Sequence, residues 1–320
     1  MATHRPRRAA LALSLACGLA LWSPPAQACS ICGCGDPLLT STDPAAMVGR
    51  LRLQVDTEYL RVDAGTDGVP GSTDQLTQWS TRLDVAWRPL DDLSLVATLP
   101  YVSKVIRTVE GGDRLTASAL SGLGDVEVGA RWTAWRSVQV GARRAQELAV
   151  SAGTMAPTGQ KQAREGGALI DPHGQLGTGG WGPFAGLHYR FEEGPWSAFA
   201  SLSYRVRTEA RYFDATRYEF GDALLWSVHG QWLATRRLAL DLGVDGRRAA
   251  ADRATSETGE VEDPVVNTGG TVLAVVPAAY LNATGGLWLF VRGQLPVLKR
   301  LEGEQDVEPT VTVGLQVQLL

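Results

Sequence analysis

Three cysteines stand close together near the start of the sequence, in the segment CSICGCG, at Cys29, Cys32 and Cys34. Thiolates are soft ligands that suit copper(I) and zinc(II). The C-x-x-C spacing presents two sulfurs to one ion and the C-x-C spacing adds a third, while Gly33 and Gly35 allow a short loop to wrap around it. These residue types and spacings predict a soft-metal site, with copper or zinc as the ion.

Two other interpretations of this segment stay open. In the first, two of the three cysteines pair in a local disulfide, as an oxidising compartment favours. In the second, Cys29 is the lipidated first residue of a lipoprotein, although AQAC lacks the leucine that normally precedes such a cysteine by three residues. No histidine follows at ligand spacing and the sequence has no second C-x-x-C. We rank metal binding first, the disulfide second and lipidation third.

The segment before the cysteines has the form of a secretory signal peptide. Arginines precede an apolar run over 9–22, and Ala26 and Ala28 follow at the A-x-A spacing, so cleavage is expected after Ala28. The run is shorter than the roughly 20 residues that a membrane-spanning helix needs. The sequence therefore predicts a signal peptide over 1–28 and an exported, cysteine-rich segment over 29–48.

Composition narrows the class of protein. The formal net charge is −4, and no basic stripe is present, which argues against nucleic acid as a partner. The chain contains 36 Gly, 10 Trp and 7 Tyr and has no long apolar run after residue 22. Transmembrane β-barrels have this composition, because their strands alternate and carry no continuous apolar segment.

Alternation of apolar and polar residues predicts the strands. In LRLQVDTEY (51–59) and WSTRLDVAW (79–87), one face is apolar and the other is charged, which is the period of a β-strand. Trp79 and Trp87 lie about 26 Å apart at ~3.3 Å per residue, the height of the apolar band between two aromatic girdles. Similar segments cover 126–132, 181–191, 196–206, 226–232, 238–244 and 310–319, and less regular β-rich ones cover 93–106, 145–157, 269–282 and 286–298.

We therefore expect an all-β fold, a transmembrane antiparallel barrel of about 12 strands over 49–320. Short turns near 89–92, 192–195, 235–237 and 283–285 alternate with long polar loops near 63–76, 107–121, 158–179, 207–220, 250–268 and 299–307. This alternation is typical of the outer membrane of Gram-negative bacteria, with the short turns and both chain ends in the periplasm. A secreted soluble sheet protein also alternates along its strands but has no reason to alternate its loop lengths. One departure is the end of the chain, QVQLL, since such barrels usually finish on an aromatic residue.

Three motifs in order carry a family resemblance. They are GLGDVEVGARW (122–132), APTG (156–159) and LGTGGWGPFAGLHYR (176–190). Together they resemble the outer-membrane barrel family named for the meta-pathway of phenol degradation, over residues ~90–210. The resemblance implies a transporter-like barrel in contact with outer-membrane lipid, and the family's name does not define a substrate.

Polar residues on the predicted inner face mark the candidate solute path. A barrel of about 12 strands has an interior between the filled eight-stranded case and the open porin, which suits a gated passage for a small molecule or a metal solute. For Asp125 we favour a structural role, as a salt bridge or turn cap, over a substrate contact. The candidates are Arg82, Asp84, Asp125, Glu127, Arg131, His188, Arg190, His229 and Asp241.

No arrangement of residues in the sequence assigns catalytic roles, so we do not expect an enzyme. His173, in the loop sequence DPHG, is expected to be solvated. The favoured function is an outer-membrane channel for a small solute with a soft-metal segment at its periplasmic mouth. The alternatives are a metal-homeostasis binding protein anchored by the barrel and a structural barrel with a closed lumen.

Overall fold

The computed structural model describes residues 49–65, 72–110, 113–165, 168–212, 216–256 and 258–319. The predicted signal peptide and the cysteine-rich segment lie outside these residues. Among the described residues, no helix has the length and apolar character needed to cross a membrane.

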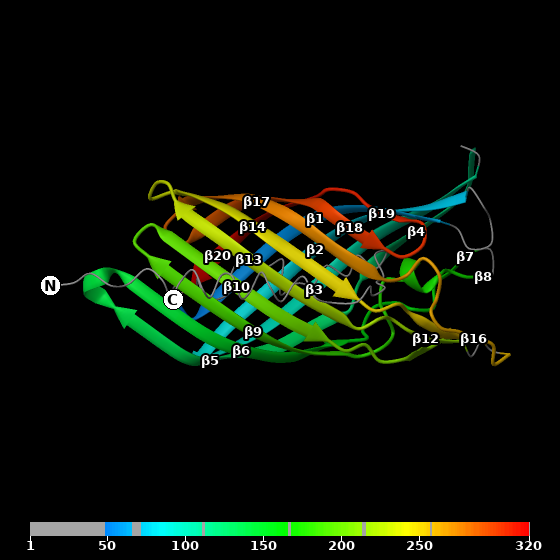
Figure 1. Cartoon of the computed structure of the whole chain (residues 1–320), viewed down its shortest axis with the longest axis horizontal. Coiled ribbons are helices and arrows are strands. Elements are labelled where there is room, and N and C mark those ends of the chain that lie inside the picture. The colour runs from blue at the N-terminus through cyan, green and yellow to red at the C-terminus, as the bar shows by residue number, and fades with distance from the viewer. Residues whose placement is uncertain are drawn as a thin grey trace.

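Twelve long strands form one closed sheet (Figure 1). Each pairs antiparallel with its neighbours in the chain, and the last pairs back onto the first, with Leu51 opposite Leu319. Closure gives each of these twelve strands a partner strand on both sides. The strands are β1 (Leu51–Gly65), β2 (Ser72–Leu90), β3 (Leu93–Glu110), β5 (Val126–Gln139), β6 (Arg144–Ala156), β9 (Gly182–Glu193), β10 (Trp196–Arg205), β13 (Ala223–Leu233), β14 (Leu238–Ala249), β17 (Gly270–Thr284), β18 (Leu287–Leu301) and β20 (Thr310–Leu319).

The predicted all-β antiparallel barrel of about 12 strands is therefore confirmed. Shorter elements extend it or lie at one end. The strand β3 pairs with β5 along its first part and with β4 (Asp113–Leu123) along its second. In the same way β1 pairs first with β20 and then with β19 (Gln305–Val307). The others are β7 (Arg164–Glu165), β8 (Ala168–Leu169), β11 (Ala210–Arg211), β12 (Arg217–Glu219), β15 (Arg253–Thr255), β16 (Val261–Glu262) and the 3-10 turns η2 (Val140–Ala142) and η3 (Pro172–Gly174).

The barrel wall is apolar outside and polar inside, the reverse of a soluble barrel. On β1, Arg52, Gln54, Asp56 and Glu58 are all buried, and Asp56 is 2% exposed. On β2, Trp79 is 52% exposed. Because successive residues of a strand point to opposite faces, the period of two seen in the sequence sorts charges inward and tryptophans outward.

The two ends of the barrel differ in the length of their connections. At one end, where the β20 strand finishes, tight turns join β2 to β3, β5 to β6, β9 to β10, β13 to β14 and β17 to β18 (Figure 1); we call it the short-turn end. The longer connections gather at the other end, the long-loop end.

Two of the expected long loops are mostly strand. The pairing of β1 with β2 continues to Gly65 opposite Thr73, and that of β3 with β4 continues to Glu110 opposite Asp113. The sequence predicted loops here because the side chains are polar. The strands continue instead, because backbone hydrogen bonds between paired strands do not depend on the polarity of the side chains.

Candidate functional site: the barrel lumen

A single inward-folded connection fills much of the long-loop end. Residues 157–165 and 168–181, which we call the plug loop, belong to the connection from β6 to β9 and include η3. The Nζ atom of Lys104, on the inner face of β3, donates to the carbonyl oxygens of His173 at 2.9 Å and Gln175 at 2.7 Å. Lys104 is buried. A buried ammonium group that binds two loop carbonyls holds this loop against the wall.

Asp125 fastens both ends of the plug loop. It lies at the break between β4 and β5. One carboxylate oxygen accepts from the backbone N–H of Gly159 at 2.9 Å, and the other accepts from the N–H and the hydroxyl of Thr178, both at 2.7 Å. Asp125 therefore anchors a loop, in keeping with the structural role favoured from the sequence.

The prediction that His173 is solvated was wrong. His173 is 5% exposed, and its Nε2 lies 2.7 Å from the hydroxyl of Tyr218 and 3.2 Å from Oδ2 of Asp252. That hydroxyl also donates to Oδ2 of Asp252 at 2.7 Å. The partners come from two other connections far along the chain, so nothing local to DPHG signals the burial.

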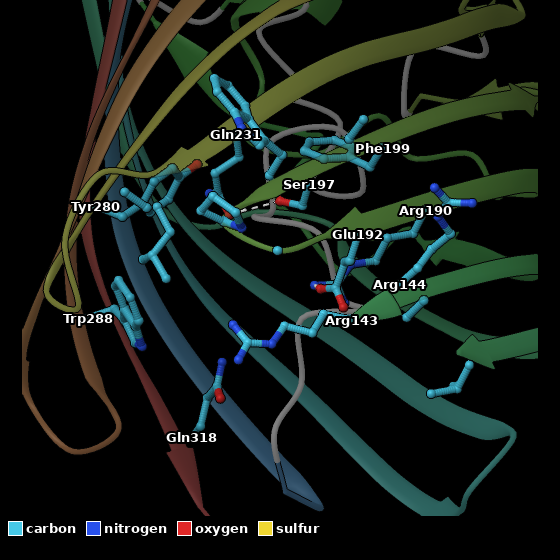
Figure 2. A pocket seen from close by; sticks show the side chains of 18 of the residues that line it. Arg143, Arg144, Arg190, Glu192, Ser197, Phe199, Gln231, Tyr280, Trp288 and Gln318 are labelled. Carbon is cyan, nitrogen blue, oxygen red and sulfur yellow. Dashed lines mark hydrogen bonds and ion pairs between the residues drawn. The ribbon is translucent and has the colours of Figure 1, made fainter. Parts of the chain in front are cut away.

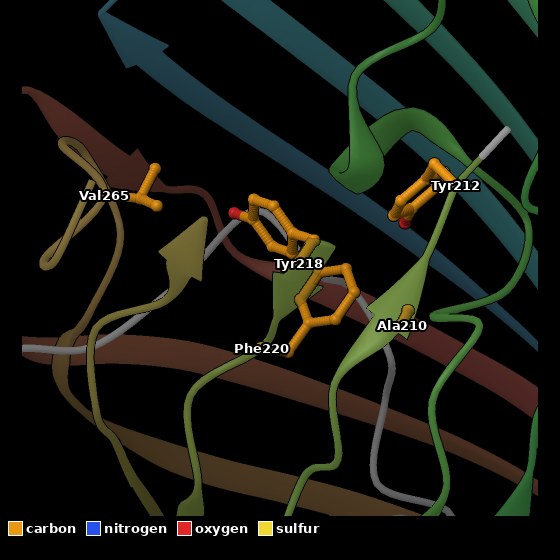
Figure 3. Close-up of a cluster of buried hydrophobic side chains, with 5 residues drawn as sticks. All are labelled: Ala210, Tyr212, Tyr218, Phe220 and Val265. Atoms are coloured by element: carbon orange, nitrogen blue, oxygen red, sulfur yellow. The ribbon is translucent and has the colours of Figure 1, made fainter. Parts of the chain in front are cut away.

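A small apolar cluster completes the filling of this end (Figure 3). Its members come from the connection between β10 and β13 and from that between β14 and β17. The ring of Phe220 meets the His173 ring edge to face, with centroids 5.4 Å apart. Three connections thus pack on one another around the histidine. The cluster consists of Ala210, Tyr212, Tyr218, Phe220 and Val265.

Paired charges occupy the inner wall below the plug loop; we call this the ion-pair layer. Arg82 donates to Oδ1 of Asp56 at 2.6 Å and lies 3.4 Å from Glu58. Arg205 on β10 pairs with Glu127 on β5, and two strands of the wall lie between them. Buried charges are stable only when paired in this way. The same layer includes the contacts of Arg131 with Glu147 and of Thr98 with Asp84.

His229 lies in a second part of the ion-pair layer. Its Nδ1 is 2.7 Å from Oδ1 of Asp241 and its Nε2 is 2.9 Å from Oδ1 of Asp245. Arg292 binds the other oxygen of Asp245. The ring of Phe199 stacks on the imidazole with centroids 4.6 Å apart. Two carboxylates thus fix the histidine ring in one orientation.

The nine predicted lumen residues separate into three groups. Seven are buried on the inner wall, namely Arg82, Asp84, Glu127, Arg131, His188, His229 and Asp241. Among the nine, the structure brings His229 and Asp241 into contact, while His188 bonds to Ser151 at 2.8 Å. Arg190 lines a cavity at the short-turn end, and Asp125 anchors the plug loop.

Lys104 and Asp252 are buried residues of the long-loop end that the sequence did not single out. A signal existed for Lys104, because lysine is rare in this chain and this one stands within a predicted strand. No such signal existed for Asp252, whose partners are contributed by other loops.

The described residues of the short-turn end surround an open space. A cavity of about 550 Å³ opens there (Figure 2), which we call the short-turn cavity. One part of its lining is charged and another is aromatic, and four glutamines add amide groups. The charged residues are Arg143, Arg144, Arg190 and Glu192, the aromatic ones include Phe199, Tyr280, Trp288 and Phe290, and the glutamines are Gln139, Gln231, Gln316 and Gln318.

A closed antiparallel barrel with an apolar outer face and a polar lumen is the fold of outer-membrane β-barrel proteins. An outer membrane channel from Pseudomonas putida F1 has a similar structure, with a TM-score of 0.63 and 14% identity over 87% of this chain and 99% of that one. Looser likenesses are the translocator domain of the autotransporter NalP from Neisseria meningitidis (TM-score 0.48, 11% identity, 97% and 98% covered) and a FadL homologue from Pseudomonas aeruginosa (TM-score 0.44, 12%, 92% and 99%).

No family model matches the sequence, and no curated protein matches it either. The resemblance to the meta-pathway family therefore stays a prediction. Within the described residues no group of three or more metal-ligating side chains gathers. Cys29, Cys32 and Cys34 lie outside those residues, so the predicted soft-metal site also stays a prediction.

Proposed function

We propose that this protein is a gated channel for a small solute in the outer membrane of a Gram-negative bacterium. The short turns would then face the periplasm and the long loops the exterior. The observation that carries the proposal is the asymmetry of the lumen. One end is filled by a loop held through a few polar contacts, and the other holds a cavity of solute size.

The contacts that hold the plug loop are separate from those that close the wall. A hydrogen bond to a charged group contributes about 1.5–3 kcal/mol, and Asp125 and Lys104 together make five such bonds to the plug loop. The twelve-stranded wall is closed by continuous pairing that does not depend on these bonds. Release of the plug loop can therefore open a path while the barrel stays intact.

The test is conductance of the full mature chain in planar lipid bilayers. Asp125→Ala removes three hydrogen bonds and should raise the open fraction at least tenfold, because a loss of only about 1.4 kcal/mol already changes an equilibrium tenfold. Glu209→Ala is the matched control, since Glu209 is an exposed carboxylate of the long-loop end that lies 4.0 Å from Arg217. If both variants and the parent protein stay silent, the channel proposal fails.

A structural barrel with a closed lumen is the second candidate, favoured by the buried ion-pair layer. The same bilayer experiment separates the two, since a structural barrel does not conduct after Asp125→Ala. A soft-metal role for Cys29, Cys32 and Cys34 is a separate proposal that rests on thiolate chemistry. Copper binding by the mature chain should fall when the three are changed to Ser; unchanged binding would contradict it.

A further inference from the structure

We propose that the short-turn cavity binds an amphipathic carboxylate, a ligand with a flat apolar body and one anionic end. Its role as a solute site rests on the proposed channel function. The binding itself rests on three features of the described residues: the size of the cavity, the aromatic part of its wall and the position of Arg143.

The size and the wall suit a small ring system. Ligand pockets commonly have volumes of about 300–1,000 Å³ with mostly apolar walls and a few placed polar groups, and this cavity is about 550 Å³. Tyr280 and Phe290 lie with ring centroids 5.7 Å apart, and Trp288 lines the same side of the cavity (Figure 2). An aromatic body can pack on such rings in offset or edge contacts.

The charges favour an anion. Three arginines and one glutamate line the cavity. Arg190 pairs with Glu192, and Arg144 pairs with Glu193 at 2.7 Å. Arg143 has no ion pair with any described residue. In Figure 2 its guanidinium extends into the cavity towards Trp288 and Gln318. A guanidinium presents parallel N–H donors that match the two oxygens of a carboxylate.

The backbone holds Arg143 in place. Its φ of 47° and ψ of 42° lie in the left-handed region, which favours glycine and costs a residue with a side chain about 1–2 kcal/mol. Its carbonyl oxygen accepts from the N–H of Gly194 at 3.1 Å, so the turn after β5 is tied to the turn after β9. An arginine kept in a conformation that favours glycine, beside a cavity, points to a role for its side chain.

A carboxylate with an apolar body uses both parts of the wall. A neutral aromatic molecule would leave the Arg143 guanidinium without an anionic partner, and inorganic phosphate would leave the rings without contact. A site for neutral aromatic molecules would bind a charged and an uncharged probe equally, and a phosphate site would bind phosphate as tightly as an aromatic carboxylate.

The experiment is isothermal titration of the full mature chain in lipid nanodiscs, with empty nanodiscs as the blank. The probes are 1-naphthoate and 1-naphthamide, which share the ring and differ in charge. We expect naphthoate to bind at least tenfold more tightly. Arg143→Gln should weaken naphthoate at least fivefold and leave naphthamide unchanged, while Arg143→Lys should retain most of the difference.

Arg236→Gln is the matched control, because Arg236 is an exposed turn arginine of the same end that does not line the cavity. Heat-modifiable gel migration checks that each variant folds. Equal affinities for the two probes, equal effects of Arg143→Gln and Arg236→Gln, or phosphate binding as tight as naphthoate would each overturn the inference. Binding at equilibrium can be measured whether or not the solute crosses the barrel. If Asp125→Ala does not conduct but still binds naphthoate, only the channel proposal is refuted. If Asp125→Ala conducts but does not bind naphthoate, only the present inference is refuted.

Discussion

The two ends of the lumen are built on the same strands but use their polar side chains differently. At the long-loop end Lys104, His173 and Asp252 are buried and bonded to partners on other connections. At the short-turn end Arg143 extends into a cavity instead. The strand pattern is the same along the whole wall, so the difference comes from the length of the connections. A long connection can fold back into the lumen and satisfy inward groups, whereas a turn of a few residues cannot.

The depth of burial determines how much a charge pair contributes to the stability of the barrel at each end. A buried pair that loses one partner leaves an uncompensated charge and costs about 3–5 kcal/mol. An exposed pair contributes about 0–1 kcal/mol because water screens it. Charge pairs near the long-loop end should therefore stabilise the barrel, and those at the short-turn end should contribute little to its stability.

The largest expected effect is on the buried pair of Glu127 with Arg205. Glu127→Gln should lower the free energy of unfolding by about 3 kcal/mol or more, since Arg205 is almost wholly buried and loses its anionic partner. Urea unfolding in detergent micelles, followed by tryptophan fluorescence, measures this change. A loss below about 1 kcal/mol would mean that water screens this half of the lumen, and the contrast between the two ends would disappear.

An intermediate effect is expected for the plug loop. Lys104→Met keeps an unbranched side chain that is one atom shorter and removes two charge-assisted hydrogen bonds. The open fraction in bilayers should rise roughly tenfold, because these bonds contribute about 1.5–3 kcal/mol each and water compensates part of the loss. Lys161→Met is the control within the same loop, since its ammonium group lies at 3.5 Å from the carbonyl of Gly179 and should change the open fraction less than twofold. A larger effect of Lys161→Met than of Lys104→Met would place the gate elsewhere.

The smallest expected effect is at the short-turn end. Glu193 pairs with Arg144, and their side chains are 44% and 38% exposed. Glu193→Gln should change the free energy of unfolding by less than about 1 kcal/mol in the same urea experiment. A loss as large as that of Glu127→Gln would show that exposure does not separate the two ends.

Much of the wall was predictable from the sequence. The alternation in 51–59 and 79–87 assigned Asp56 and Arg82 to the lumen and Trp79 to the outer face, because a strand has only two faces and one of them must be apolar. The same rule identified His229 and Asp241 as inward residues. It also gave the number of strands, since each apolar segment between turns corresponds to one crossing of the wall.

The contents of the lumen were not predictable in the same way. His173 is buried through Tyr218 and Asp252, which follow it by 45 and 79 positions in the chain, so no local pattern signals the contact. The short-turn cavity likewise depends on residues from several strands and turns. Pairings across a barrel depend on register and on loop packing, neither of which has a period that a single sequence displays.

The pairing of Leu51 with Leu319 closes the wall at the junction of β1 and β20, and this junction differs from all the others in sequence separation. Every other junction of the wall joins strands near in sequence, whereas this one must bring the two ends of the barrel together and pays the loop-closure entropy of nearly the whole chain. Until β20 pairs with it, one edge of β1 is open to pairing with another strand. A chain cut before Thr310 would keep its hairpins and lose its closure, so the last ten residues of the sheet protect the first fifteen from mispairing.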